Sequence, residues 1–133
     1  MYPKTPEEWP QVFEQHINAG DLDAAIALYE PDAHFISPSG ETLVGRDAIR
    51  QEVSRLIEAK THMKSRVIKA VTVGDIAQLY TDFERTMVDG QGHTVTRHSR
   101  AIELLRRRPD GSWGLIVGDP NGRERVAGGS QTL

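Results

Sequence analysis

Residues 18–33 read NAGDLDAAIALYEPDA, a run that contains the end of one helix and the whole of the next. Gly20 suits the left-handed residue that often ends a helix, because glycine has no Cβ to clash. Asp21 can then cap a second helix by accepting a backbone hydrogen bond. The apolar face of that helix would consist of Leu22, Ala25, Ile26 and Tyr29. Pro31 would end it, since proline interrupts helical hydrogen bonding.

Two further helices flank this run. Upstream, Thr5-Pro6-Glu7-Glu8 has the form of a capping box with proline at the first helical position. The apolar residues that follow at helical spacing are Trp9, Val12, Phe13 and Ile17. Downstream, a short strand is expected at 34–37, followed by a turn, and a third helix from about 46 to 60. The stripe of that helix is Ile49, Val53, Leu56 and Ile57.

The second half of the chain has the short periodicity and the turn signals of long hairpins. It predicts strands at residues 64–73, 76–88, 94–107 and 112–117. Helices first and an antiparallel meander afterwards indicate an α+β fold. One domain over residues 1–122 accounts for this pattern. Residues 123–133 have no core-forming pattern, so we expect them to form a mobile tail.

The composition is that of an ordinary soluble protein, with 133 residues, 38% hydrophobic, 26% charged and a formal net charge of −3. So small a net charge does not attract polyanions, and there is no long apolar run. We therefore expect neither a nucleic-acid partner nor a membrane partner. The absence of cysteine excludes disulfides, thiolate metal sites and a cysteine nucleophile. The start of the chain lacks the basic and apolar regions of a signal peptide, so we expect a cytoplasmic location.

Three segments carry a resemblance to a known superfamily: residues 18–33, Gly45-Arg46-Asp47-Ala48-Ile49, and LLRRRPDGSW at residues 104–113. In order and spacing they strongly resemble the nuclear transport factor 2-like, or ketosteroid isomerase-like, superfamily over about residues 7–122. The third segment resembles a bacterial branch of SnoaL-like proteins of mostly unassigned function. The resemblance implies a cone-shaped roll, with three N-terminal helices packed on a curved antiparallel β-sheet, an internal pocket and a homodimer. This fold serves both enzymes and binding modules, so it does not fix the function.

The resemblance to ketosteroid isomerases also implies three catalytic positions: a carboxylate base before a proline, a tyrosine, and a protonated carboxylic acid. At the first position this chain has Ser37, whose hydroxyl cannot act as a base near neutral pH without a partner. At the second it has Phe13, which has no hydrogen-bond donor. At the third it has Glu103, which keeps a carboxyl group. Only one of the three roles could be filled, so isomerisation by the steroid-type route is disfavoured.

Two other carboxylates are candidates for acid–base chemistry. Asp119 stands in Gly118-Asp119-Pro120, where SnoaL-like proteins tend to have Asp-Asn-Pro, so the carboxylate has moved by one residue. Such a shift would turn Asp119 away from the pocket unless a bulge or the approach to the proline restores it. Asp82 lies in the middle of a predicted strand, either as a rim or dimer-face charge or as a partner of Glu103. If Asp82 and Glu103 share a face, repulsion and burial would raise one pKa.

The remaining candidates have a simpler interpretation beside a functional one. His98 could act as an acid, a base or a ligand contact, although a sheet-surface or interface histidine explains it as well. The other histidines lack metal-binding spacing, so we predict no metal site, and we expect no cofactor. Arg106-Arg107-Arg108 has no aromatic platform beside it and fits a solvated strand end. The pocket wall would include Phe13 and Tyr29, with Ser37 and His98 as polar contacts.

These features predict a homodimer that binds a small apolar or amphipathic metabolite. Any catalysis would be cofactor-free proton transfer of the isomerase or lyase type, with Asp82, Glu103 and Asp119 as acid or base groups. One alternative is a non-catalytic ligand-binding or assembly module. Another is a hydratase or epoxide hydrolase, which needs a carboxylate that positions water beside a second acid. Apolar residues on both faces of the strand at 76–88 predict dimerisation through the convex face of the sheet.

Overall fold

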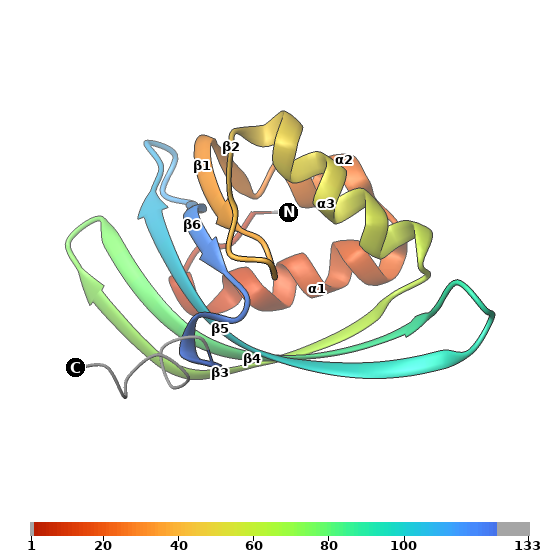
Figure 1. The fold of residues 1–133 in the computed structure, drawn as a ribbon. Helices are drawn as coiled ribbons and strands as arrows, with labels where there is room; N and C mark the ends of the chain where they lie inside the picture. Colours follow the sequence, from red (N-terminus) through yellow and green to blue (C-terminus); the bar gives the residue numbers. More distant parts are fainter. Residues whose placement is uncertain (1, 125–133) are drawn as a thin grey trace.

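In the computed structural model, which describes residues 2–124, three helices lie against the concave face of a curved sheet (Figure 1). The helices are α1 (Trp9–Ala19), preceded by the 3-10 turn η1 (Pro6–Glu8), α2 (Leu22–Ile26) and α3 (Arg46–Glu58). The strands are β1 (Tyr29–Ile36), β2 (Thr42–Val44), β3 (His62–Val73), β4 (Ile76–Val88), β5 (Thr94–Arg107) and β6 (Trp113–Asp119). The predicted α+β class and cone fold are confirmed.

The strands form one sheet in the order β2-β1-β6-β5-β4-β3. β1 and β6 run parallel, whereas the other neighbours are antiparallel. The pairing shifts between Val67 and Lys69 of β3 and between Leu104 and Leu105 of β5. Such irregularities bend a strand and increase its twist. They let the long strands curve beneath α1 and α3 (Figure 1).

The boundary between α1 and α2 follows the prediction, whereas the start of α1 does not. Gly20 has a φ of 72°, and the side chain of Asp21 accepts a hydrogen bond from Ala24 N at 3.1 Å. Thr5 makes no side-chain cap, so the predicted capping box is wrong. Glu8 instead accepts from the backbone N–H of Lys4 at 3.0 Å, and residues 6–8 form η1.

The second helix is shorter than the sequence predicts. α2 ends at Ile26, and Tyr29 begins β1 instead of completing the helical face. Pro31 therefore lies inside a strand. The pairing of β1 with β6 is interrupted between Tyr29 and His34, so the missing N–H of Pro31 removes no regular ladder bond. Arg46 fixes the start of β1 by donating from Nε and NH2 to Tyr29 O, at 2.9 and 2.7 Å.

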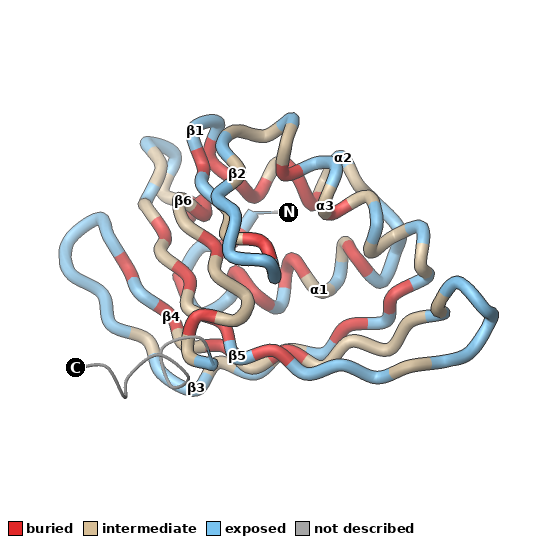
Figure 2. Tube along the Cα trace, viewed as in Figure 1, coloured by how far each residue is buried: buried red, intermediate tan, exposed pale blue. Residues whose placement is uncertain are grey.

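The core lies between the helices and the inner face of the sheet, while the hairpin tips are exposed (Figure 2). Burial alternates along β4 and β5, which is the two-residue period of a half-buried strand. The inward residues of these strands are Ala77, Leu79, Thr81, Phe83, Ser99, Ala101, Glu103 and Leu105. Trp9 anchors α1, because its Nε1–H donates to Leu28 O at 3.0 Å and its ring stacks on Phe13 with centroids 5.1 Å apart.

The chain after β6 turns back to the sheet. Of the predicted tail, residues 125–133 lie outside the described residues. Arg123 forms an ion pair with Asp82, and its guanidinium lies 5.4 Å from the centroid of the Tyr80 ring. Between residues 2 and 124, no helix is both long and apolar enough to cross a membrane.

Candidate ligand-binding site

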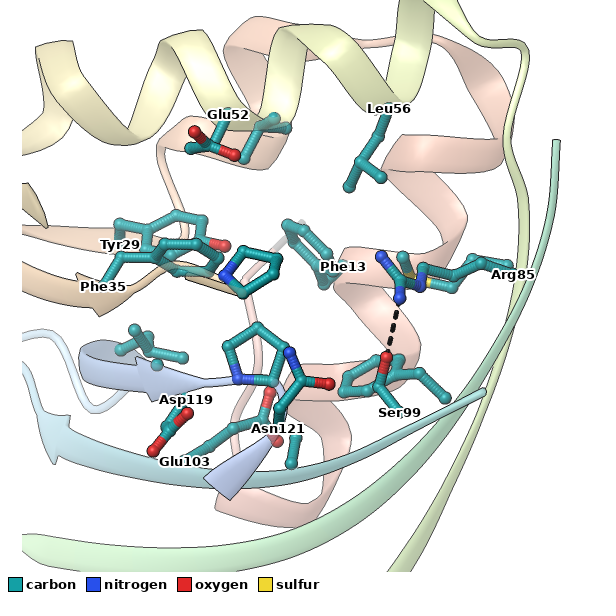
Figure 3. A pocket seen from close by; sticks show the side chains of 18 of the residues that line it. Phe13, Tyr29, Phe35, Glu52, Leu56, Arg85, Ser99, Glu103, Asp119 and Asn121 are labelled. Carbon is teal, nitrogen blue, oxygen red and sulfur yellow. Dashed lines mark hydrogen bonds between the residues drawn. The ribbon is translucent and has the colours of Figure 1, made fainter. Parts of the chain in front are cut away.

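A cavity of about 110 Å³ lies between the inner face of the sheet, α1 and α3 (Figure 3). This volume far exceeds the roughly 10–15 Å³ that one buried water needs, so the cavity has room for a small organic molecule. The largest apolar side chains of its wall are Trp9, Phe13, Phe35, Leu56, Met63 and Phe83. The polar residues that border it are Tyr29, Glu52, Arg85, Ser99, Glu103, Asp119 and Asn121. Mostly apolar walls with a few polar groups are typical of small-molecule sites.

Glu103 is a carboxyl group buried in the wall of this cavity. It points inward from β5 and is 4% exposed. Thr81, inward on β4, donates to its Oε1 at 2.7 Å. Burial raises the pKa of Glu103 to about 7, against a smaller opposite effect of the bond from Thr81. Near neutral pH the group is therefore divided between its acid and its carboxylate form, and can act as either.

Tyr29 brings a hydroxyl to the same cavity. Its ring packs edge-on against Trp9 and Phe13, with centroids 5.7 and 5.9 Å apart. Figure 3 shows the hydroxyl directed into the space between the walls. Burial raises the pKa of Tyr29 well above its ordinary value of 10.0, and the nearby charge of Glu103 raises it further. The phenol therefore keeps its proton and can donate a hydrogen bond to a ligand oxygen.

Arg85 brings a guanidinium to the wall from β4. Its NH2 donates to Ser99 Oγ at 2.8 Å, the contact drawn in Figure 3. Burial lowers the pKa of Arg85, the adjacent charge of Arg97 lowers it further, and Glu124 opposes both. The cavity thus contains an acidic and a basic group in addition to the phenol.

Glu52 reaches the cavity from α3. Its side chain is 24% exposed, and its Oε1 accepts from Arg55 NH1 at 2.8 Å. An ion pair between a carboxylate and an exposed arginine one turn along the helix stabilises the surface of α3, and it does not prepare the carboxylate to act as an acid or base. Glu103 is therefore the better candidate for chemistry. Among residues 2–124, no three histidine, aspartate or glutamate side chains lie close enough together to hold a metal ion.

Comparison with known proteins defines the family. The model of the SnoaL-like domain matches residues 11–116. The chain belongs to the SnoaL-like domain family. No curated protein matches it. The structural relatives of this SnoaL-like domain show the same fold at low sequence identity.

One such relative is a ketosteroid isomerase-like protein from Erwinia carotovora atroseptica, with a TM-score of 0.72 and 22% identity over 86% of this chain and 95% of the other. An NTF2-like protein with a cystatin-like fold from Novosphingobium aromaticivorans has a TM-score of 0.71 and 18% identity, over 85% and 76%. An NTF2-like superfamily protein from Salmonella enterica has a TM-score of 0.71 and 17% identity, over 85% and 84%. At these identities the likeness shows the fold alone.

Four residues singled out from the sequence border the cavity of this SnoaL-like domain: Phe13, Tyr29, Glu103 and Asp119. Asp119 differs from the others. In the sheet it pairs with Ile102, whereas Gly118 pairs with Glu103, so the side chains of Asp119 and Glu103 leave the sheet from opposite faces. A Cβ on Gly122 would lie 3.0 Å from both Asp119 Oδ2 and Ile102 Cγ1, which places this carboxylate on the outer side. Figure 3 shows it directed away from the centre of the cavity.

The structure does not bring Asp82 and Glu103 together. Asp82 pairs with Arg100, while Glu103 pairs with Leu79, and the inward positions of β4 are odd-numbered. Asp82 therefore faces outward, where Arg123 is its partner. The hypothesis of a carboxylate pair on one face is wrong, because both strands keep a regular two-residue alternation between these positions.

His98 and Ser37 also lie away from the cavity. His98 is exposed on the outer face, opposite Glu84, where it lines a second hollow that the cavity does not include. Ser37 is buried in the turn between β1 and β2, where its Oγ lies 2.8 Å from Ser39 Oγ and its N–H donates to Glu41 O at 2.8 Å. The residue next to it, Pro38, borders the cavity instead.

Sequence reasoning misses four polar residues of the site: Glu52, Arg85, Ser99 and Asn121. The sequence does contain a signal for Arg85. It lies two residues after the inward Phe83, so it should also face inward, where a charged side chain is unusual. Ser99 follows once the pairing of β5 with β4 is known, since it lies opposite Phe83. No local signal identifies Glu52, whose approach to the cavity depends on how α3 packs.

Proposed function

We propose that this SnoaL-like domain binds a small, mostly apolar carbonyl compound and moves a proton on the carbon beside the carbonyl group. The observation that carries the proposal is a single buried carboxyl group, Glu103, in an apolar cavity that also contains the Tyr29 hydroxyl. Tyr29 would donate a hydrogen bond to the carbonyl oxygen. The carboxylate form of Glu103 would take the α-proton and return it to the same or another carbon.

The electrostatics of the cavity support these roles. A base is most effective when its pKa lies near the working pH, and the pKa of Glu103 is about 7. A phenol held in its neutral form in a dry site stabilises the negative charge that develops on an enolate oxygen. Tyr29 supplies this donor from β1, although the position implied by the resemblance is occupied by Phe13. A solved relative named ketosteroid isomerase-like shares the fold, which is consistent with proton transfer in such a cavity.

Exchange of carbon-bound protons in D₂O tests the proposal directly. With 2-heptanone as the probe, proton NMR should detect faster loss of the α-protons in the presence of the protein than in buffer alone. Glu103→Gln should lower the protein-dependent rate by about 10²–10⁴-fold, because it removes the base. Tyr29→Phe should lower it by about 10–10³-fold, because it removes the donor. The rate should rise with pH and level off above about 7, where the carboxylate form of Glu103 predominates.

Asp82→Asn is the matched control, because it removes a carboxylate from the outer face and should leave the exchange rate unchanged. Saturable binding of 2-heptanone without exchange would favour a non-catalytic binding module. No saturable binding at all would refute the proposal.

We also propose that a second copy of this chain covers the convex face of the sheet. Val71 and Val73 of β3 and Ile76 of β4 are 49%, 73% and 39% exposed there. Farther along the same sheet lie basic residues, such as Arg66 and Arg100, interspersed with acidic ones. Such a surface can match its own copy about a two-fold axis, apolar part on apolar part and basic groups against acidic ones.

A further inference from the structure

Among residues 2–124, Arg85 is the one positively charged residue that borders the cavity, and the proposed function does not use it. It occupies an inward position of β4, two residues after Phe83, and borders the cavity. A charged side chain is seldom kept on the apolar side of a strand without a partner, because removing a charge from water is costly. Its position therefore requires an explanation beyond packing.

Within residues 2–124, the guanidinium of Arg85 has one hydrogen-bond acceptor, Ser99 Oγ. Its Nε is buried and has no acceptor among these residues, and no described carboxylate forms an ion pair with it. Arginine presents its N–H groups as a planar fork that fits the two oxygens of a carboxylate. Arg85 as a whole is only partly buried, so its guanidinium, which has one acceptor among the described residues, can receive such a group from the cavity.

We propose that Arg85, with Ser99 beside it, binds the carboxylate of the ligand, so that the ligand is a keto acid rather than a neutral ketone. The inference rests on the proposed function for the other end of the ligand, where the carbonyl oxygen meets Tyr29. A carboxylate suits this site better than a phosphate, because the cavity offers one guanidinium and one hydroxyl at this end and its walls are otherwise mostly apolar.

The distance between the carboxylate-binding end of the cavity, at Ser99, and the reacting end, at Glu103, sets the length of the ligand. Ser99 and Glu103 are four residues apart on the inner face of β5, which corresponds to about 13 Å along the strand. Two polar contacts of about 3 Å each leave about 7 Å between the carboxylate and the reacting group. Ala101 lies between them on the same face, and its methyl group leaves room for the body of the ligand. A chain of about five bonds spans this gap.

Isothermal titration calorimetry at pH 7 with three probes tests the inference. The probes are 6-oxoheptanoate, 2-heptanone, which has the ketone without the carboxylate, and heptanoate, which has the carboxylate without the ketone. The wild-type protein should bind 6-oxoheptanoate at least ten-fold more tightly than 2-heptanone. Arg85→Gln should abolish this difference by weakening the binding of 6-oxoheptanoate. Arg85→Lys, which keeps the charge but loses the fork, should retain part of it.

Arg97→Gln is the matched control. Arg97 pairs with Arg85 across the two strands but is exposed and does not border the cavity. Its removal changes the net charge equally, so it should preserve the preference for 6-oxoheptanoate. Loss of the preference in both variants would mean a general charge effect and would overturn the inference. If Arg85→Gln does not fold, the comparison of probes on the wild-type protein and on Arg85→Lys decides.

The outcomes separate this inference from the proposed function. Equal affinities of wild-type protein for 6-oxoheptanoate and 2-heptanone, or tight binding of the acid that survives Arg85→Gln, would overturn the role of Arg85. Glu103-dependent exchange of 2-heptanone would then still stand. Conversely, if heptanoate binds as tightly as 6-oxoheptanoate and its binding depends on Arg85, the carboxylate site is supported and recognition of the ketone is refuted.

Discussion

At the scale of single residues, strand parity decides what a carboxylate can do in this protein. Glu103 and Asp82 lie on adjacent strands that pair with each other, yet one faces the cavity and the other faces Arg123 on the outside. Only the inward carboxyl group is cut off from water, and desolvation is the main cause of its raised pKa. Glu103 can therefore act as an acid or a base near neutral pH.

The raised pKa of Glu103 also predicts how stability depends on pH. Because the folded protein holds this proton more tightly than the unfolded chain, unfolding releases it at pH values between the ordinary 4.5 and about 7. The contribution to stability is complete below about pH 4.5 and is lost as the pH rises through about 7. From pH 5 to pH 8 the free energy of unfolding should fall by about 2–3 kcal/mol from this group alone.

Urea denaturation of the wild-type protein and of Glu103→Gln at pH 5 and pH 8 measures this contribution. The glutamine keeps an oxygen that can accept from Thr81 but cannot ionise, so the variant should lose less stability than the wild type over this range. Equal losses in the two proteins would show that Glu103 titrates normally.

At the scale of secondary structure, the end of α2 determines the chemistry of the cavity. As a helical residue, Tyr29 would complete the apolar face of α2. As the first residue of β1 it reaches Trp9 and Phe13, and its hydroxyl enters the cavity. Leu28 holds this arrangement, since its carbonyl oxygen accepts from both Trp9 Nε1 and Leu115 N at 3.0 Å. Tertiary hydrogen bonds therefore override the helical periodicity of the segment.

The turn that precedes α2 gives a test at the same scale. Gly20→Ala should lower the free energy of unfolding by about 1 kcal/mol, because a φ of 72° is unfavourable for a residue with a Cβ. Apart from the chain next to it, nothing lies within 4 Å of the position that this Cβ would take, so the cost is conformational and not a clash with packed groups. Gly90→Ala is the control: its Cβ would also meet nothing within 4 Å, and its φ is not positive. A similar loss in both variants, measured by thermal or urea denaturation, would contradict this explanation.

At the scale of the whole molecule, a partly buried ionic cluster joins segments that are far apart in the sequence. Arg108 Nε donates to Glu30 Oε2 at 2.7 Å, with side chains 15% and 11% exposed, and Arg106 approaches Glu30 Oε1 at 3.3 Å. Gly114 permits this contact, because a Cβ there would lie 2.6 Å from Glu30 Oε2. The arginine run is therefore not a fully solvated strand end. Its ion pairs with Glu30 connect the start of β1 to the hairpin between β5 and β6.

Dimerisation is the prediction at this scale. Light scattering coupled to size exclusion should give about twice the mass of one chain, 14.8 kDa. Val73→Glu should shift the protein toward the monomer, because the added carboxylate would be desolvated in the interface. Val44→Glu is the control, since Val44 is 58% exposed on β2, at the far edge of the sheet from β3. A monomeric wild-type protein, or equal effects of the two substitutions, would contradict the proposed interface.

The sequence by itself determined the order of the three helices and of every strand except the short β2, because Gly20, Asp21 and the alternation of the long strands are local signals. It also identified Phe13 and Glu103, which border the cavity. Tertiary structure alone decided that Asp82 faces outward, that Tyr29 joins a strand, and that Arg85 enters the cavity. The physical reason is that local patterns specify which residues alternate, whereas the register between strands and the packing of helices specify which face is closed from water.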